Sequence, residues 1–195
     1  MRLALCCAAL AASPVLADCP TGADLESGIV FTTDTGETDT YTSRPNGIVQ
    51  IDALSPENVT YRTLLGKGIH VLQLSDLENG QVLSDSIVST SYPMAAAELP
   101  VPEPGTRWRV DTMINAYGDI YPETQTQTYG QMTAYTVGDC TFDAIPAKFR
   151  YESDGFTINE DIIYLPDLGL SLLVAYEDTD APREDYAYVA VTVAQ

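Results

Sequence analysis

Residues 162–175 read Ile-Ile-Tyr-Leu-Pro-Asp-Leu-Gly-Leu-Ser-Leu-Leu-Val-Ala. Two apolar runs, 162–165 and 170–175, flank the turn-forming residues Pro166 to Gly169. Short, nearly continuous apolar runs that are bounded by turn residues are typical of strands buried on both faces. We therefore expect a β-hairpin here, at the centre of the hydrophobic core.

The rest of the sequence has the same β character. It contains twelve Tyr and many Thr and Val, and almost no stretch repeats apolar residues at helical spacing. Short gaps with Gly-containing turns favour hairpin-connected antiparallel neighbours. The predicted strands are 28–33, 38–42, 48–53, 60–65, 69–75, 81–90, 107–116, 126–137, 140–151, 156–164, 170–176 and 186–193. The sequence predicts an all-β or β-rich protein, an antiparallel meander that forms a strongly curved sheet, a half-barrel or a sandwich, with few short helices.

The apolar pattern changes face within the predicted strand 140–151. Up to Phe142 the apolar residues occupy even positions, and from Ile145 to Tyr151 they occupy odd positions. Side chains alternate between the two faces of a strand, so a β-bulge near residues 144–146 is expected.

Residues 93–105 interrupt the strand pattern, because proline cannot donate to the ladder of a sheet. The prolines of this segment are Pro93, Pro100, Pro102 and Pro104. The segment is either a linker or a covering loop with one helical turn, and the sequence leaves both open. We predict a single β-rich domain over 18–195, with a candidate internal boundary at 93–105.

The first seventeen residues have the features of an export signal. Arg2 is a short basic start, Leu3 to Ala12 form an apolar run too short to span a bilayer, and Ala17 supplies the small residue before a cleavage site. We expect cleavage near Ala17, a mature chain that begins at Asp18, and a periplasmic or secreted location.

Two of the four cysteines, Cys6 and Cys7, leave with the signal. The remaining two lie in a compartment where thiols are oxidised and permit one intramolecular bridge, so we predict a disulfide between Cys19 and Cys140. A lipid anchor on Cys19 is the alternative. Asp18 is charged where a lipoprotein signal has a small uncharged residue, which favours simple secretion.

The chain is strongly acidic, with a formal net charge of −19, and loss of Arg2 makes the mature chain more acidic still. Such a charge repels nucleic acid phosphates and anionic lipid head groups, so neither is an expected partner. No segment after the signal is long and apolar enough to cross a membrane. Solubility, cation binding and a basic partner each explain the charge, and composition does not separate them.

Two turn motifs lie in the C-terminal half, Gly138-Asp139-Cys140 and 164–169, Tyr-Leu-Pro-Asp-Leu-Gly. Through them, over residues 126–176, the chain resembles exported bacterial β proteins without assigned function. Similar meanders occur in the periplasmic lipoprotein-carrier superfamily. That resemblance implies a strongly curved antiparallel sheet, a half-barrel with a hydrophobic concave face. The helices that line the half-barrel in those carriers have no counterpart in this sequence.

Three motifs invite a catalytic or metal-binding interpretation. Asp34-Thr35-Gly36 matches the aspartic protease triplet but occurs once, and a hairpin turn explains it better. The sole histidine, His70, lacks an accompanying nucleophile motif and further zinc ligands, so we predict a hydrogen-bonded strand histidine. The acidic stretch 177–185 lacks the glycine and glutamate of an EF-hand and is predicted to be an exposed loop. We predict no catalytic residue, metal site or cofactor.

Four of the nine basic residues form two pairs, Arg107-x-Arg109 and Lys148-x-Arg150. Alternation places the two members of each pair on one face of a strand. If the two strands are neighbours, Arg107, Arg109, Lys148 and Arg150 form a candidate anion-binding patch near Trp108. Salt bridges to local carboxylates are the alternative, which we favour.

The leading interpretation is a non-enzymatic exported envelope protein that binds an apolar or amphipathic ligand, such as a lipid-like molecule, or an envelope protein, on a β-sheet face. One alternative is a structural or protein-interaction module with an exposed Tyr-rich face. That face would comprise Tyr117, Tyr121, Tyr129 and Tyr135 with Gln125, Gln127 and Gln131. The other alternative is a hydrolase, which would have convergent Asp, Glu or His residues in a cleft.

Overall fold

The computed structural model describes residues 19–194, so the expected export signal and its cleavage site lie outside the described residues. In chain order the elements are η1 Gly22–Glu26, β1 Ile29–Thr33, β2 Thr38–Arg44, η2 Pro45–Gly47, β3 Ile48–Leu54, β4 Thr60–Gly66, β5 His70–Glu78, β6 Gln81–Val82, β7 Val88–Ser91, η3 Ala96–Glu98, β8 Arg107–Ala116, β9 Asp119–Tyr129, β10 Thr133–Val137, β11 Cys140–Ser153, β12 Phe156–Leu165, β13 Leu170–Asp178, β14 Glu184–Asp185 and β15 Tyr188–Val193. The helical elements η1 to η3 are short 3-10 turns. Over this part of the chain no helix is long and apolar enough to span a bilayer.

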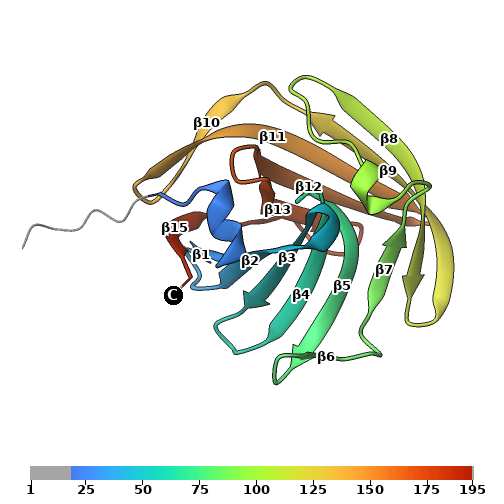
Figure 1. Ribbon diagram of the computed structural model, residues 1–195. Helices are drawn as coiled ribbons and strands as arrows, with labels where there is room; N and C mark the ends of the chain where they lie inside the picture. The colour runs from blue at the N-terminus through green and yellow to red at the C-terminus, as the bar shows by residue number, and fades with distance from the viewer. Residues whose placement is uncertain (1–18, 195) are drawn as a thin grey trace, which may run out of the picture.

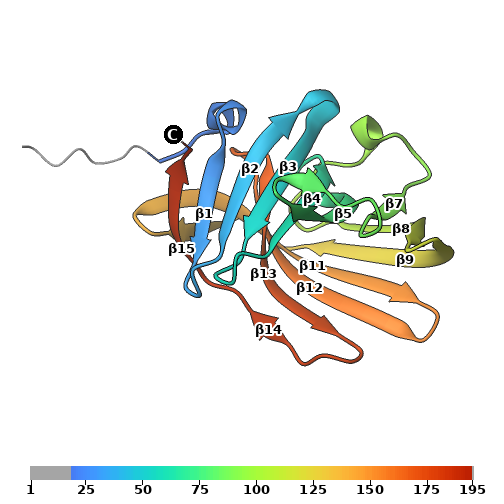
Figure 2. The ribbon, with the colours of Figure 1, turned by 90° about the horizontal axis from the view of Figure 1, so that it is seen from below.

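The strands form one antiparallel sheet that does not close on itself. Its order is β14-β13-β12-β11-β9-β8-β7-β5-β4-β3-β2-β1-β15, with β6 paired to β5 and β10 paired to β11. Figures 1 and 2 show how the sheet curls, so that β1 to β5 lie opposite the β12–β13 end of the sheet. The predicted β-rich antiparallel meander with few short helices is confirmed.

The hairpin of β12 and β13 is buried as its apolar runs predict. Leu170 and Leu172 are fully buried and belong to the same hydrophobic cluster as Phe31 of β1. Ile162 and Tyr164 belong to a second cluster, which is built mainly from β11 and β12. The β12–β13 hairpin therefore contributes side chains to two hydrophobic clusters.

Strand β11 changes its buried face at Ala144 and Ile145, which are consecutive buried residues. Up to Ala144 the strand pairs with β10, and from Ile145 it pairs with β12. The change of face lies at the point where the strand exchanges one partner for another. The described pairings of β11 contain no register shift there, so this exchange of partners stands where a β-bulge was expected.

Two predicted strands are wrong in extent. The predicted strand 126–137 is divided into β9, which already begins at Asp119, and the separate β10. The pairing of β9 with β11 ends at Thr124, and Pro122 lies beyond it, in the part of β9 that pairs with β8. The predicted strand 81–90 is likewise divided into β6 and β7.

The proline-rich segment is a loop with one 3-10 turn that packs on the rest of the molecule. The strands on either side of it, β7 and β8, pair directly with each other. Leu99 is buried and lies close to Gly66 of β4, and the carbonyl oxygen of Pro100 is 2.7 Å from Nε2 of His70. Of the two structures that the sequence left open, the segment has the covering loop with a helical turn.

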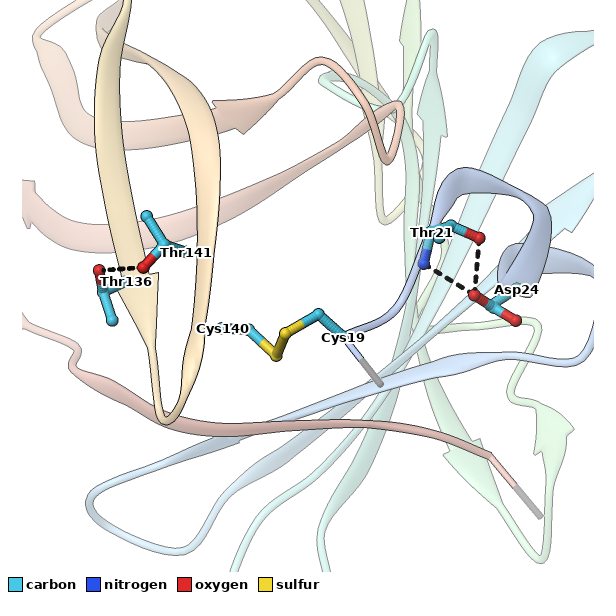
Figure 3. The surroundings of a disulfide bond; sticks show 6 residues. All are labelled: Cys19, Thr21, Asp24, Thr136, Cys140 and Thr141. Atoms are coloured by element: carbon cyan, nitrogen blue, oxygen red, sulfur yellow. Dashed lines mark hydrogen bonds between the residues drawn. A yellow bond between two sulfur atoms is a disulfide. The ribbon is translucent and has the colours of Figure 1, made fainter. Parts of the chain in front are cut away.

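The predicted disulfide between Cys19 and Cys140 is present, with a Cα–Cα distance of 5.5 Å (Figure 3). It joins the first described residue to the start of β11. Close by, the carboxylate of Asp24 accepts hydrogen bonds from the backbone N–H and the hydroxyl of Thr21, at 2.7 and 2.8 Å, and so caps η1. The N-terminal segment is thereby held against the β10–β11 hairpin.

Candidate functional site

A cavity of about 220 Å³ lies between the two ends of the curved sheet. This is the volume that about seven water molecules occupy in the liquid. Its apolar lining residues are Ile51, Ala53, Leu65, Ile69, Val71, Leu74, Ile162 and Leu173. Its polar lining residues are Thr33, Glu37, Asp39, Tyr41, Tyr61, Thr63, Glu160, Ser171, Tyr186 and Tyr188. Most of this lining comes from β1 to β5, β12 and β13, strands that are far apart in the sequence.

Side chains alternate between the two faces of a strand, so only every second side chain of a lining strand points into the cavity. On β4, Tyr61, Thr63 and Leu65 point into it, whereas Arg62 points away and forms an ion pair with Asp52, with an N–O distance of 2.6 Å. Tyr61 and Leu74 line the cavity and are both exposed to solvent. These two residues mark its mouth.

Each of the three carboxylates in the lining accepts a hydrogen bond from a tyrosine hydroxyl. The pairs are Tyr61 to Glu37, Tyr188 to Asp39 at 2.8 Å, and Tyr151 to Glu160 at 2.9 Å. Burial raises the pKa of Asp39 to about 6 and the pKa of Glu160 to about 7, because removal from water disfavours the charged form. In both groups the tyrosine hydrogen bond opposes this shift only in part.

The cavity lining contains no lysine, arginine or histidine. The ion pairs among the described residues use other acids, namely Asp52, Glu152, Asp161 and Asp185. The carboxylates of the cavity therefore have no basic counter-ion in this part of the chain. The chemistry of the site is that of an apolar wall with hydrogen-bonded acids.

His70 is fully buried at the start of β5 and lies outside the cavity lining. Its Nε2 is 2.7 Å from the carbonyl oxygen of Pro100, and its Nδ1 is 3.2 Å from Nε2 of Gln127. The ring of Trp108 packs against it edge-to-face at 5.0 Å. Burial lowers the pKa of His70 to about 4, so the ring is neutral at neutral pH. The predicted hydrogen-bonded strand histidine is confirmed.

The four clustered basic residues share the outer face of the sheet, but their strands are not neighbours. Strand β9 lies between β8 and β11, so Arg107 and Lys148 flank Thr128. In the next row Arg109 and Arg150 likewise lie on either side of β9. Trp108, which alternation directs to the opposite face, does not join them.

Half of this basic cluster is already paired with acids. Lys148 is 2.7 Å from Asp161, and Arg150 is 3.0 Å from Glu152. The positive charge of Arg109 also helps to lower the pKa of Glu152. Local salt bridges, the alternative that we favoured from the sequence, thus account for both residues of β11.

The tyrosine- and glutamine-rich tract divides between the interior and the surface. Tyr129, Gln125 and Gln127 are buried, whereas Tyr117 at the β8–β9 turn is 77% exposed. Ile120 beside it is 68% exposed. The tract therefore does not form one exposed face, and its exposed apolar part is the tip of a hairpin.

Of the other two motifs, one is a turn, and the acidic stretch 177–185 runs from the end of β13 through a turn to β14. Asp34-Thr35-Gly36 connects β1 and β2, and the N–H of Gly36 donates to the carbonyl oxygen of Thr33 at 3.0 Å. In the acidic stretch, a carboxylate oxygen of Asp178 accepts hydrogen bonds from the backbone N–H groups of Asp180 and Ala181, at 2.8 and 2.7 Å. Among residues 19–194 no group of three or more His, Cys, Asp or Glu side chains is arranged to hold a metal ion.

Sequence reasoning missed the acids of the cavity, although a local signal was present. Asp39 has the same strand parity as Tyr41, and Glu160 has the same parity as Ile158 and Ile162. An acid on the apolar face of a strand is unusual, because burial of a charge is costly. That pattern marks Asp39 and Glu160 as candidates, but it does not reveal that their strands face each other.

The fold and the site define the class of protein as an all-β chain whose single curved sheet carries an acidic, apolar-walled cavity. No protein-family model and no curated protein matches the chain. Among solved structures, it is similar to the hypothetical lipoprotein YmcC from Escherichia coli (K12), with a TM-score of 0.43 and 9% sequence identity. The match covers 87% of this chain and 88% of the other. A likeness at this level defines neither a family nor a function.

Proposed function

We propose that this protein is a non-enzymatic exported binding protein, and that its cavity holds the apolar part of a small amphipathic ligand. The observation that carries the proposal is the cavity of about 220 Å³, whose lining includes eight aliphatic side chains. Ligand sites of proteins are concave and mostly apolar, with a few polar groups that orient the ligand. The volume suits a small molecule, or one end of a longer one that extends through the mouth.

The surroundings of the cavity favour binding over catalysis. In one respect the cavity has what the hydrolase alternative requires, because Glu37, Asp39 and Glu160 converge in its lining. Each of these carboxylates, however, accepts its hydrogen bond from a tyrosine hydroxyl and not from a serine or cysteine that it could activate. The lining also contains no histidine, lysine or cysteine. The Cys19–Cys140 disulfide agrees with an exported location, because disulfides persist in oxidising compartments.

Fluorescence titration with 1-N-phenylnaphthylamine, a neutral apolar dye, tests the proposal. We expect saturable binding of about one dye per chain. Thr63→Trp fills the cavity from β4 and should abolish this binding, whereas Thr128→Trp, on the outer face of β9, should leave it unchanged. Circular dichroism of both variants checks that they fold. Absence of saturable binding to the parent, or full binding to folded Thr63→Trp, contradicts the proposal.

A further inference from the structure

The carboxylates of the cavity have unused capacity to accept hydrogen bonds. Among the described residues, the side chains of Glu37, Asp39 and Glu160 each have one hydrogen-bond donor, a tyrosine hydroxyl. An ionised carboxylate offers about four acceptor sites. A ligand with N–H donors therefore finds vacant carboxylate acceptors in the lining of an apolar-walled cavity.

The same carboxylates lack a counter-ion. Ionised groups removed from water are costly unless an opposite charge and hydrogen bonds compensate them. The cavity lining supplies no basic side chain, and the net charge of −19 strengthens the negative potential there. An anionic ligand would meet repulsion from these acids, and a cationic ligand would supply the opposite charge that the lining lacks.

The aromatic residues of the lining favour a cation as well. Tyr41, Tyr61, Tyr186 and Tyr188 all line the cavity. Ring faces of tyrosine attract ammonium and guanidinium groups, because the face of an aromatic ring carries partial negative charge. The hydroxyls of Tyr41, Tyr61 and Tyr188 are held by the carbonyl oxygen of Ser171 and by Glu37 and Asp39, which restrains their rings.

We propose that the ligand is a cationic amphiphile, a small molecule with one protonated amine or ammonium group on an apolar body. Its head group lies among Glu37, Asp39 and Glu160, and its body lies against the aliphatic side chains of β3 to β5, β12 and β13. This inference rests on the proposed function, because it names the ligand class of the same cavity.

Three probes of equal chain length test the inference, each used below its micelle-forming concentration to displace 1-N-phenylnaphthylamine. They are decylammonium, decan-1-ol and decanoate at pH 7.5. We expect decylammonium to bind at least tenfold more tightly than decan-1-ol, and decanoate to bind more weakly than either. Between pH 8 and pH 5 the affinity for decylammonium should fall, because Asp39 and Glu160 become protonated, while that for decan-1-ol stays constant. The negative charges of Glu37, which faces Asp39, and of Glu123, which faces Glu160, favour this protonation.

Isosteric variants assign the preference to the acids. Glu160→Gln alone should reduce the ratio between decylammonium and decan-1-ol affinities, and Asp39→Asn with Glu160→Gln should reduce it below threefold. Glu177→Gln is the matched control, because Glu177 lies on the outer face of β13, and it should keep the parent ratio. Retained dye binding shows that each variant still has the cavity.

The outcomes separate this inference from the proposed function. Equal affinities for the three probes, tighter binding of decanoate, or a ratio unchanged in the double variant would overturn the cationic ligand while the cavity remains a binding site. No binding of the dye or of any probe to the parent would instead overturn the proposed function.

Discussion

Glu160 places a carboxyl group on the same face of β12 as Ile162, within an apolar wall. Its environment disfavours the charged form, because the low polarity there outweighs the hydrogen bond from Tyr151. A group whose pKa is raised by folding binds its proton more tightly in the folded state. The ionisation of Glu160 is therefore coupled to stability as well as to ligand binding.

We predict that this coupling makes the folded state more stable in mild acid. The pKa of Glu160 rises from 4.5 to about 7 on folding, so its contribution is full below about pH 4.5 and is lost as the pH rises through 7. Urea unfolding at pH 5, 6, 7 and 8 should show this decline in the parent and a shallower decline in Glu160→Gln. Glu177→Gln should follow the parent, and an equal slope in all three proteins would contradict the prediction.

His70 illustrates what a single residue reveals before its neighbours are known. Its place within a strand predicted a hydrogen-bonded strand histidine, and the absence of accompanying motifs argued against catalysis. Both inferences depend on local sequence alone. Its partners, Pro100 and Gln127, lie 30 and 57 residues away and follow from the packing of the proline-rich loop and β9 around β5.

At the scale of elements, two turns pack against each other across the open sheet. Gly68 in the β4–β5 turn has a φ of +71°, and an added Cβ would lie 2.0 Å from the carbonyl oxygen of Gly169 in the β12–β13 turn. Backbone atoms cannot move aside as a flexible side chain can. This contact therefore holds the hairpin of β12 and β13 against the β4–β5 turn.

We predict that Gly68→Ala destabilises the protein far more than Gly80→Ala. Gly80 has a similar φ of +77°, but a Cβ there meets no atom within 4 Å, so the substitution costs only backbone strain of about 1–2 kcal/mol. Gly68→Ala adds a backbone clash to the same strain and should lose at least about 2 kcal/mol more. Urea denaturation measures both, and equal losses would mean that the two turns do not constrain each other.

At the scale of the whole molecule, the disulfide closes a long covalent loop in the described chain. Cys19 and Cys140 are 121 residues apart, so the bridge restricts the unfolded chain strongly. It also fixes the N-terminal segment to the β10–β11 hairpin, next to β15. The N-terminal segment is thereby tied to the β10–β11 hairpin, which contacts the last strand, β15.

We predict that Cys19→Ser with Cys140→Ser lowers the free energy of unfolding by about 4–5 kcal/mol, the chain-entropy value for a loop of this length. Reductant should produce the same loss in the parent. Thr141→Ala, which removes an exposed hydrogen bond beside the bridge, should cost less than about 1 kcal/mol. A double serine variant as stable as the parent would show that the bridge has no part in stability.

Local sequence patterns were sufficient to predict the β character, most strand positions, the buried β12–β13 hairpin and the change of face in β11. These features depend on the alternation of side chains and on turn residues, which act over a few positions. The disulfide followed from the sequence as well, because the other two cysteines, Cys6 and Cys7, lie within the expected export signal. The same reasoning misjudged the predicted strand 126–137, because β9 already begins at Asp119 and ends at Tyr129, before the separate β10.

The cavity and its acids were decided by the tertiary structure. Glu37 and Asp39 line the same cavity as Glu160 only because the sheet curls. The curl brings β2 opposite β12, which lies more than a hundred residues later in the chain. Alternation tells which face of a strand a residue occupies, but not which distant strand that face meets. The curvature of the whole sheet, which no short stretch encodes, therefore creates the site.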